Sequence, residues 1–365
     1  MTIGIGGAGS KLAVQLDPDA TAVNVSETEL SKTEAKHRIL AVVHAARGQL
    51  RGSRKNPQIG RDAFLSVKRE LLHLIRGNTV LGSTGGGTGN GILAGILDEL
   101  TAMEQVPEND KTVFGLILPH AELEPAEFIN NTISFLEGPL SEAIDSGNTG
   151  NIFLLSNRLK FESRLAELAY NERLSESLNV FLSIPHKGEH CNLVDGHIDY
   201  EDFAQFVARP YFNHFTYFDY DPETPFETQL SENYNPYLLT PDNPIEALFL
   251  LELPPGADPS SFYDVLEYFA KTDVNPIYSV IENPERKAPF ITVSLLYFRK
   301  PAQLVQDFHK VSEEHAQARV RKSLEQHVVL PKLQVNMESE VKRMAKQQGT
   351  DEQEVLSILK RLGKI

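Results

Sequence analysis

Short apolar runs alternate with longer amphipathic stretches through the first half of the chain. The apolar runs are residues 1–3, 21–25, 78–81, 112–118 and 151–155. Their length and composition predict buried strands, whereas residues 31–49, 62–75 and those from 92 onward predict helices. This alternation predicts an α/β fold with a parallel, Rossmann-like sheet that has helices on both faces.

A predicted central helix at residues 169–184 is followed by a different pattern. Beyond residue 210, the runs at 212–220, 245–253 and 290–298 predict strands, and residues 259–271 predict a helix with Asp258 as its N-cap. These elements predict a second, smaller α+β domain with surface loops at 221–244. We therefore expect a first domain (1–168), a central helix (169–185), a second domain (186–330) and a helical tail (331–365).

The C-terminal part of the chain is mostly helical and, from residue 310, carries more basic than acidic side chains. Residues 350–353 fit a capping box, and Val355, Leu356, Leu359 and Leu362 form an apolar stripe. The stripe is expected to dock on the body of its own chain, on another subunit or on an adaptor. The C-terminal part has a net charge opposite to that of the body, which favours docking of the stripe on another subunit.

The formal net charge of −15 over 365 residues argues against a body that binds nucleic acid directly. A single cysteine, Cys191, excludes an internal disulfide framework and indicates a reducing compartment. The sequence has no apolar run of 18 residues and no signal-peptide pattern at its N-terminus. We therefore expect a cytoplasmic protein without membrane attachment.

The most distinctive stretch is the glycine run at residues 82–91, Gly-Ser-Thr-Gly-Gly-Gly-Thr-Gly-Asn-Gly, between a strand and a helix. Where Cβ atoms are missing, the backbone can turn sharply and bring its N–H groups close to a ligand. Beside a helix N-terminus these groups suit an anion, usually phosphate. A flexible linker is the alternative, but the apolar flanks are not typical of linkers. No Gly-Lys-Ser/Thr follows, so the run is not a Walker loop.

A second glycine segment, Gly4-Ile5-Gly6-Gly7-Ala8-Gly9, fits the dinucleotide pattern GxGxxG after the first strand. That pattern requires an acidic residue about 20 positions later, where this chain has Asn24-Val25-Ser26. An NAD-dependent oxidoreductase therefore stays open as an alternative, although it explains only this segment.

Together and in this order, the two glycine segments resemble the tubulin/FtsZ superfamily. Residues 85–91 resemble its signature Gly-Gly-Gly-Thr-Gly-Ser/Thr-Gly, with Asn90 in the Ser/Thr place. The resemblance implies a GTPase that binds GTP or GDP together with Mg²⁺. The implied phosphate contacts are Gly6, Gly7, Ala8, Gly9, Gly85, Gly86, Gly87, Thr88 and Gly89.

The segments around the phosphates carry the same resemblance. Asn24 lies at the strand end that approaches the nucleotide and its magnesium, although Ser26 replaces the usual Asp of FtsZ. Residues 54–60, Arg-Lys-Asn-Pro-Gln-Ile-Gly, resemble the loop that senses the γ-phosphate. This similarity implies phosphate contacts from Lys55 and Asn56.

The ribose and the base have implied contacts further along the chain. Glu124 either contacts the ribose or begins a solvated acidic helix. Asn157 lies in a segment that resembles the loop after the equivalent FtsZ strand. Residues 170–174 resemble the segment that reads guanine, which implies recognition by Asn171 and stacking by Tyr170.

Asp199 and Asp202 lie three residues apart at a predicted helix start, where capping is the simplest role. The segment also resembles the FtsZ motif Asn-x-Asp-x-x-Asp, with His197 in place of the Asn. In FtsZ these acids project into the nucleotide pocket of the next subunit. The resemblance implies that Asp199 and Asp202 are catalytic and complete the site of a neighbour in a head-to-tail filament.

The loop at 185–196 and the Phe-Ala-Gln sequence after the acids favour the TubZ type within this superfamily. The resemblance therefore implies a homopolymer that segregates or positions plasmid or phage DNA, with a DNA-binding adaptor on the C-terminal tail. An FtsZ-like division protein and a non-hydrolysing filament protein stay open as alternatives.

Overall fold

The computed structural model describes residues 1–45, 48–239, 243–299, 302–325, 342, 345–346 and 351–361. The chain divides into two compact units, Met1–His315 and Ala316–Ile365, and each is described by itself. The first unit contains an 11-stranded sheet within the described residues, in the order β3-β2-β1-β6-β7-β8-β10-β13-β11-β12-β9.

The first part of this sheet is entirely parallel. Its strands are β1 (Thr2–Ile5), β2 (Thr21–Asn24), β3 (His37–Leu40), β6 (Thr79–Ser83), β7 (Val113–Leu118) and β8 (Ile152–Ser156). Because all six run in one direction, their carboxyl ends lie at one edge of the sheet and their amino ends at the other. The strands predicted from the apolar runs are confirmed here.

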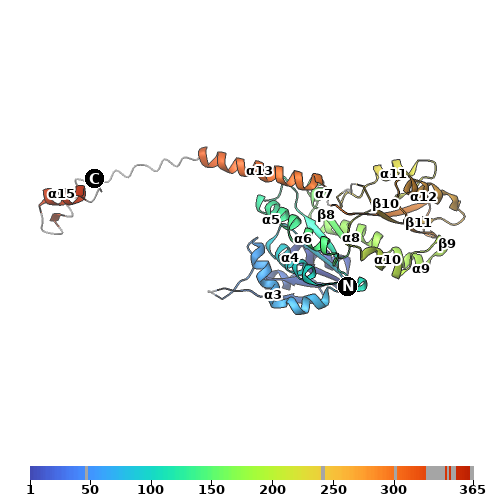
Figure 1. Cartoon of the computed structure of the whole chain (residues 1–365), viewed down its shortest axis with the longest axis horizontal. Helices are drawn as coiled ribbons and strands as arrows, with labels where there is room; N and C mark the ends of the chain where they lie inside the picture. The colour runs from blue at the N-terminus through green and yellow to red at the C-terminus, as the bar shows by residue number, and fades with distance from the viewer. Residues whose placement is uncertain are drawn as a thin grey trace. The chain divides into compact units, whose positions relative to one another are not determined.

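Helices cover both faces of the parallel part (Figure 1). They are α1 (Gly6–Leu16), α2 (Glu27–Ser31), α3 (Pro57–Leu74), α4 (Gly87–Ala102), η1 (Glu108–Asp110), α5 (Ala126–Glu137), α6 (Pro139–Ser146), α7 (Arg158–Glu162) and α8 (Glu167–Leu182). Helices α3, α4, α5 and α6 bury their apolar side chains in one core, whereas α1 and α8 pack into a second core on the opposite face. The predicted α/β class is confirmed.

The second part of the sheet is mixed and continues directly from the first. Its strands are β10 (Phe212–Asp219), β13 (Phe290–Tyr297), β11 (Glu246–Leu253), β12 (Pro276–Glu282) and β9 (Asn192–Gly196). Its helices are α9 (Ile184–His190), α10 (Tyr200–Val207), α11 (Phe226–Glu232), η2 (Pro259–Ser261) and α12 (Phe262–Lys271). The two parts are joined by the parallel pair β8 and β10, through Ile152 with Phe212 and Phe153 with Asn213.

Helix α8 connects the two parts through their shared core. Leu174, Leu178 and Phe181 of α8 are buried in the same cluster as Phe153 of β8 and Phe215 of β10. The ring centroids of Phe181 and Phe215 are 5.1 Å apart in a stacked arrangement. This packing explains why one helix serves both parts of the sheet.

The helix predicted at residues 31–49 is wrong. Instead the segment forms the end of α2, strand β3 and the short strands β4 (His44–Ala45) and β5 (Gly48–Gln49). β3 is formed because residues 37–40 pair in parallel with β2, a long-range contact that overrides local helical preference.

Two predicted loop regions also contain regular structure. The surface-loop region 221–244 contains α11, which buries Phe226 and Leu230. The region 185–196 contains α9 and β9, and β9 pairs antiparallel with β12 at the edge of the sheet. Asp258 is an N-cap as predicted, although the first turn after it is the 3₁₀ segment η2.

The C-terminal part contains α13 (Ala302–Glu325) and α15 (Glu352–Arg361). In the first unit, α13 contacts α5 through His309 with Glu137 and Ser312 with Asn130. In the second unit, Val355 is buried with Ala345, and Leu359 packs against them, so part of the predicted stripe forms a small core. Thr350 and Leu362 lie outside the described residues. Across the described residues, no helix is both long enough and apolar enough to span a membrane.

Candidate functional site

Two helix N-termini meet at the carboxyl edge of the parallel sheet. Helix α1 begins at Gly6 directly after β1, and α4 begins at Gly87 just after β6, the strand beside β1. Gly6 has a φ of +70°, and a Cβ there would lie 3.0 Å from the Gly89 nitrogen. A side chain at Gly6 would therefore be strained by the backbone conformation and by the close contact between the two backbones. The convergence of two sets of N–H groups and two helix dipoles creates a place for an anion.

A pocket of about 360 Å³ lies at this point. Many of the predicted contacts line it: Gly6, Gly7, Ala8, Asn24, Lys55, Gly86, Gly87, Thr88 and Gly89. A Cβ built on Gly86 would have no heavy atom within 4 Å, so this residue borders open space. The structure thus brings residues from four separate chain segments together around one cavity.

Cationic side chains from the loop before α3 also line the pocket. They are Arg51, Arg54 and Lys55. Arg54 and Lys55 have positive φ values of 51° and 62°, a conformation that L-residues rarely adopt. The Lys55 ammonium lies 5.3 Å from the centroid of the Phe128 ring. These cations complement an anion held by the helix N-termini.

Three of the predicted phosphate contacts, Gly9, Asn56 and Gly85, are not among the residues that line this pocket. A Cβ on Gly9 would collide with the Leu81 carbonyl, and one on Gly85 would lie 2.8 Å from Phe128 Cβ. Asn56 is the N-cap of α3, where its Oδ1 accepts a hydrogen bond from the Gln58 N–H at 2.9 Å. These residues shape the backbone beside the pocket.

Asn24 belongs to a small polar network that the structure adds to the predicted site. Its Oδ1 accepts from the Ser26 N–H at 3.1 Å, and its Nδ2 donates to Glu29 Oε2 at 3.0 Å. Ser26 caps α2, since its Oγ accepts from the Glu29 N–H at 3.3 Å. Ser26 and Glu29 both line the pocket. Glu29 is not among the residues predicted from the sequence, although Ser26-Glu27-Thr28-Glu29 matches a capping box and could have indicated it.

A second polar cluster lies at the same edge, after β7 and β8. Glu124 Oε2 accepts hydrogen bonds from the His120 N–H at 2.6 Å and from Asn157 Nδ2 at 3.2 Å. The two predicted residues Glu124 and Asn157 are therefore direct partners. The Tyr170 hydroxyl donates to the Ser156 carbonyl at 2.5 Å, next to Asn157 in the chain.

Tyr170 and Asn171 are buried at the start of α8, with exposed fractions of 2% and 8%. The Tyr170 ring packs against Tyr237, with centroids 5.7 Å apart, and burial raises the pKa of its hydroxyl. Its aromatic face is thus occupied by the core. Helix α8 packs against α1, and Lys11 and Glu167 form an ion pair of 2.7 Å between them. Asn171 therefore lies on a helix that adjoins α1, one of the two helices that begin at the pocket.

Asp199 and Asp202 lie at the opposite edge of the sheet. Asp199 is the N-cap of α10, and its Oδ1 accepts from the Asp202 N–H at 2.8 Å, which confirms the capping role. Within the described residues, the half-buried Asp202 carboxylate accepts no hydrogen bond. The far end of α10 is bound to Asn151, which donates to the Phe206 carbonyl at 3.1 Å just before β8 begins. Strand β9, which leads into α10, runs opposite to β8 and therefore ends on the side of the amino ends of the parallel strands. The paired acids follow β9 and thus lie on that side, away from the pocket of the same chain.

Two side chains that line the pocket, Glu29 and Ser26, carry oxygen atoms of the kind that Mg²⁺ uses when it binds together with phosphates. In the described parts of the chain, no group of three or more His, Cys, Asp or Glu side chains is placed to hold a metal. Mg²⁺ typically keeps several waters and binds through one or two carboxylates together with substrate phosphates. The carboxylate of Glu29 and the hydroxyl of Ser26 are oxygen groups of that kind.

Comparison with known proteins identifies the fold. No protein-family model matches the chain. The tubulin-like protein TubZ of Bacillus cereus is 27% identical over 210 residues, which cover 52% of this chain and 45% of TubZ. The match therefore spans about half the length of this curated relative.

Solved structures match over much more of the chain. The GTPγS-form protofilament of Bacillus thuringiensis serovar israelensis TubZ has a TM-score of 0.70 and 13% identity, covering 88% of this chain and 93% of that one. An empty FtsZ dimer from M. jannaschii has a TM-score of 0.60 and 18% identity, covering 82% and 88%. The chain has the tubulin/FtsZ fold.

The predicted resemblance to the tubulin/FtsZ superfamily, with similarity to TubZ, is confirmed. In this tubulin/FtsZ fold, both glycine segments begin helices at one pocket. An NAD-dependent oxidoreductase would explain only the first of them. The structures of TubZ in filament form also include a two-stranded filament, with a TM-score of 0.70 to this chain.

Proposed function

We propose that this protein binds and hydrolyses GTP and assembles head to tail into filaments. One observation carries the proposal: the phosphate-type pocket and the paired acids lie at opposite edges of the same sheet. β8 alone has five residues, which corresponds to roughly 16 Å of extended strand. Within one chain the pocket and the paired acids are therefore far apart. Stacking one subunit on the next brings the acids of one subunit to the pocket of the other.

The phosphates of GTP occupy the pocket between α1 and α4. Backbone N–H groups of residues 6–8 and 86–89 donate to the phosphate oxygens, and the two helix dipoles favour the negative charge. Lys55 lies nearest the γ-phosphate, while Gly9, Gly85 and Asn56 hold the backbone around it. Mg²⁺ binds with the nucleotide and neutralises charge on the phosphates.

The nucleoside extends from this pocket along α1 towards α8. Glu124 and Asn157, which bind each other, contact the ribose. The Asn171 amide reads guanine, because an amide both donates and accepts hydrogen bonds. The Tyr170 ring is buried and therefore does not stack on the base. Tyr170 instead holds the start of α8 in place through the hydrogen bond from its hydroxyl to the Ser156 carbonyl.

The neighbouring subunit completes the catalytic site. Its Asp202 orients or activates the attacking water, and Asp199 fixes the helix start that presents Asp202. Such a contact uses different surfaces on the two subunits. It is therefore heterologous and leads to an open filament rather than a closed oligomer.

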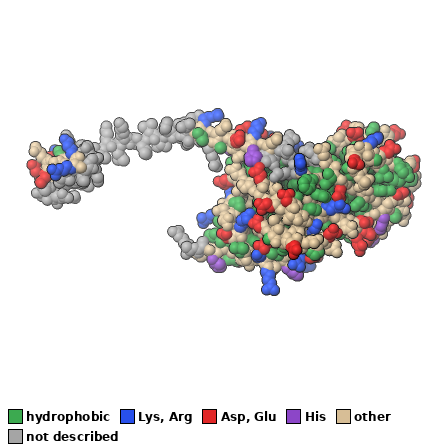
Figure 2. Space-filling model, in the orientation of Figure 1, with side chains coloured by type: hydrophobic (Ala, Val, Ile, Leu, Met, Phe, Trp, Pro, Cys, Tyr) green, Lys and Arg blue, Asp and Glu red, His purple; other side chains and the backbone are tan. Residues whose placement is uncertain are grey.

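The filament works in the cytoplasm in the segregation or positioning of plasmid or phage DNA. The net charge is −15, and acidic side chains are spread among basic ones over the face shown in Figure 2. Direct binding of DNA by the body is therefore disfavoured by charge. A DNA-binding adaptor on the C-terminal tail provides the link.

The chain has four functional parts in this proposal. They are a first domain (1–168), a central helix (169–185), a second domain (186–330) and a tail (331–365).

The test measures phosphate release from GTP against protein concentration, with 90° light scattering in parallel. The wild type is expected to show a threshold concentration above which both signals rise. Asp202→Ala is expected to scatter normally but release phosphate at least about 100-fold more slowly. Glu201→Ala, an exposed acid one residue away, is the matched control and keeps wild-type hydrolysis.

Two results would contradict the proposal in different ways. Hydrolysis that is linear in protein concentration, free of scattering and insensitive to Asp202→Ala would exclude the shared site. Absence of GTP binding by the wild type would exclude the assignment of the pocket.

A further inference from the structure

We infer that Glu29 faces the divalent cation of the bound nucleotide and makes tight nucleotide binding depend on that cation. This inference rests on the proposed function, because it assigns a role within the same pocket. Four charged side chains line the pocket: Arg51, Arg54, Lys55 and Glu29. Among the described lining residues, Glu29 is the only carboxylate, in a cavity otherwise built for an anion.

The carboxylate lies directly beside the first glycine segment. Glu29 Oε2 would be 3.2 Å from a Cβ built on Gly7, so the group borders the backbone that begins α1. Its position is fixed by two contacts at the end of β2. Asn24 donates to Oε2 at 3.0 Å, and Ser26 Oγ accepts from the Glu29 N–H at 3.3 Å.

These contacts leave one face of the carboxylate available. Within the described residues, Glu29 Oε1 accepts no hydrogen bond, and no ion pair joins Glu29 to Arg51, Arg54 or Lys55. A carboxylate and a phosphate in one small cavity repel each other when nothing lies between them. A divalent cation between the two turns this repulsion into attraction, and Mg²⁺ binds in this manner through one carboxylate and the phosphates.

The inference predicts effects of opposite sign with and without metal. With Mg²⁺ present, Glu29 strengthens nucleotide binding because it contacts the cation directly or through one of its waters. Without metal, Glu29 weakens binding because its charge repels the phosphates. A purely structural role, in which Glu29 only holds Asn24, would affect binding equally under both conditions.

The test compares wild type, Glu29→Gln and Glu27→Gln as full-length chains. Gln keeps an oxygen that can accept from Asn24, so the fold around the end of β2 is retained. Glu27 is an exposed acid on the same short helix and provides the matched control. Binding of fluorescent N-methylanthraniloyl-GDP is measured in excess Mg²⁺ and in excess EDTA. Paramagnetic resonance of Mn²⁺ measures metal affinity of the nucleotide complex separately.

For Glu29→Gln we expect the Kd in Mg²⁺ to rise about tenfold and the Mn²⁺ affinity to fall about tenfold. Its Kd in EDTA is expected to decrease, because the charge that repels the phosphates is removed. Glu27→Gln should keep the wild-type ratio of the two Kd values.

Three results overturn the inference. The first is a wild-type ratio in Glu29→Gln, the second is an equal loss of affinity with and without metal, and the third is the same change in Glu27→Gln. Absence of nucleotide binding by the wild type in both conditions would instead overturn the proposed function, and the inference with it.

Discussion

The side chain of Asn131 holds the backbone of Lys55 at the mouth of the pocket. Asn131 Nδ2, on α5, donates to the Lys55 carbonyl at 3.1 Å and also to the Gly85 carbonyl at 2.9 Å. One amide group thus connects the cationic loop to the second glycine segment. Because Lys55 has a φ of +62°, its conformation is sparsely populated and depends on such contacts.

Asn131→Ala is expected to weaken GTP binding about tenfold while leaving the fold intact. The loss of two hydrogen bonds at a half-buried site should lower the free energy of unfolding by about 1–2 kcal/mol. The measurement combines urea unfolding with titration of a fluorescent guanine nucleotide. Ser134→Ala, an exposed position on the same helix, is the control and should change neither quantity. Wild-type affinity in Asn131→Ala would show that the cationic loop keeps its conformation without this link.

Of two glycines in the run at 82–91, only Gly91 is expected to lose stability when it is replaced by alanine. A Cβ on Gly91 would collide with the Pro57 carbonyl, because α3 and α4 cross closely there, whereas Gly86 borders open space. Gly91→Ala should therefore lower the free energy of unfolding by more than about 2 kcal/mol. Gly86→Ala should leave it within about 0.5 kcal/mol of the wild type. Urea unfolding of both variants tests this, and equal stabilities would contradict the close crossing.

His214 is expected to make stability depend on pH between about 6.5 and 4. It is fully buried on β10, and the Asn235 N–H donates to Nε2 at 3.4 Å while Nδ1 lies 2.8 Å from the Leu239 carbonyl. Burial lowers the pKa of His214 to about 4. Between that value and the ordinary pKa of about 6.5, the unfolded chain binds a proton that the folded chain does not.

The free energy of unfolding should therefore fall by about 3 kcal/mol through this group as pH decreases from 6.5 to 4. Urea unfolding across this range is compared for wild type, His214→Gln and the exposed control His73→Gln. The slope of the free energy of unfolding against pH is compared between wild type and His214→Gln, and the difference reports the contribution of His214. An unchanged slope in His214→Gln would contradict a buried neutral imidazole.

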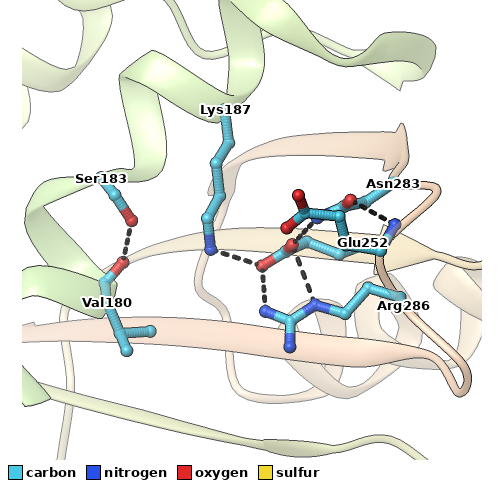
Figure 3. A network of polar contacts seen from close by, with 7 residues as sticks. Val180, Ser183, Lys187, Glu252, Asn283 and Arg286 are labelled. Atoms are coloured by element: carbon cyan, nitrogen blue, oxygen red, sulfur yellow. Dashed lines mark hydrogen bonds and ion pairs between the residues drawn. The ribbon is translucent and has the colours of Figure 1, made fainter. Parts of the chain in front are cut away.

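Glu252 is expected to stabilise the second part of the sheet through a buried ionic network. Its side chain is fully buried and accepts from Lys187 Nζ at 2.7 Å, Arg286 Nε at 3.0 Å and Asn283 Nδ2 at 2.6 Å (Figure 3). Glu252→Gln would leave the two cations without their counter-charge. We expect this change to cost about 3 kcal/mol. Glu246→Gln, which removes a more exposed pair with Arg209, should cost at most about 1 kcal/mol.

The same network gives a prediction for acid unfolding. Burial by itself raises the pKa of Glu252, but the hydrogen bonds from Arg286, Lys187 and Asn283 outweigh it and hold the pKa below the ordinary value. The stabilisation is therefore complete above about pH 4.3 and is lost as pH falls through the lowered pKa. Acid titration below pH 4.3 should show a shallower stability loss in Glu252→Gln than in the wild type. Parallel curves would argue that the network contributes nothing to acid sensitivity.

Local sequence accounted for most of the parallel part of the fold. Five of its strands are short apolar runs: β1, β2, β6, β7 and β8. Each run is enough to predict its strand, because a strand buried on both faces needs apolar side chains on both. The two glycine segments could also be predicted as ligand-binding turns, since the absence of Cβ atoms at a strand end is a local property of the sequence. The sequence alone thus determined the α/β class and the suitability of the two glycine segments for an anion, whereas α4 begins at Gly87, before the start predicted near residue 92.

Tertiary structure decided what depends on contacts between distant segments. β3 exists because residues 37–40 pair with β2, and the isolated segment gave no sign of it. Glu29 and Asn131 became part of the site only when β2, α2 and α5 were brought to one edge of the sheet. Gly9 and Gly85, by contrast, lie close to Leu81 and Phe128 and are not among the residues that line the pocket. Strand pairing and helix crossing fix these outcomes, because their energies come from partners that no local pattern specifies.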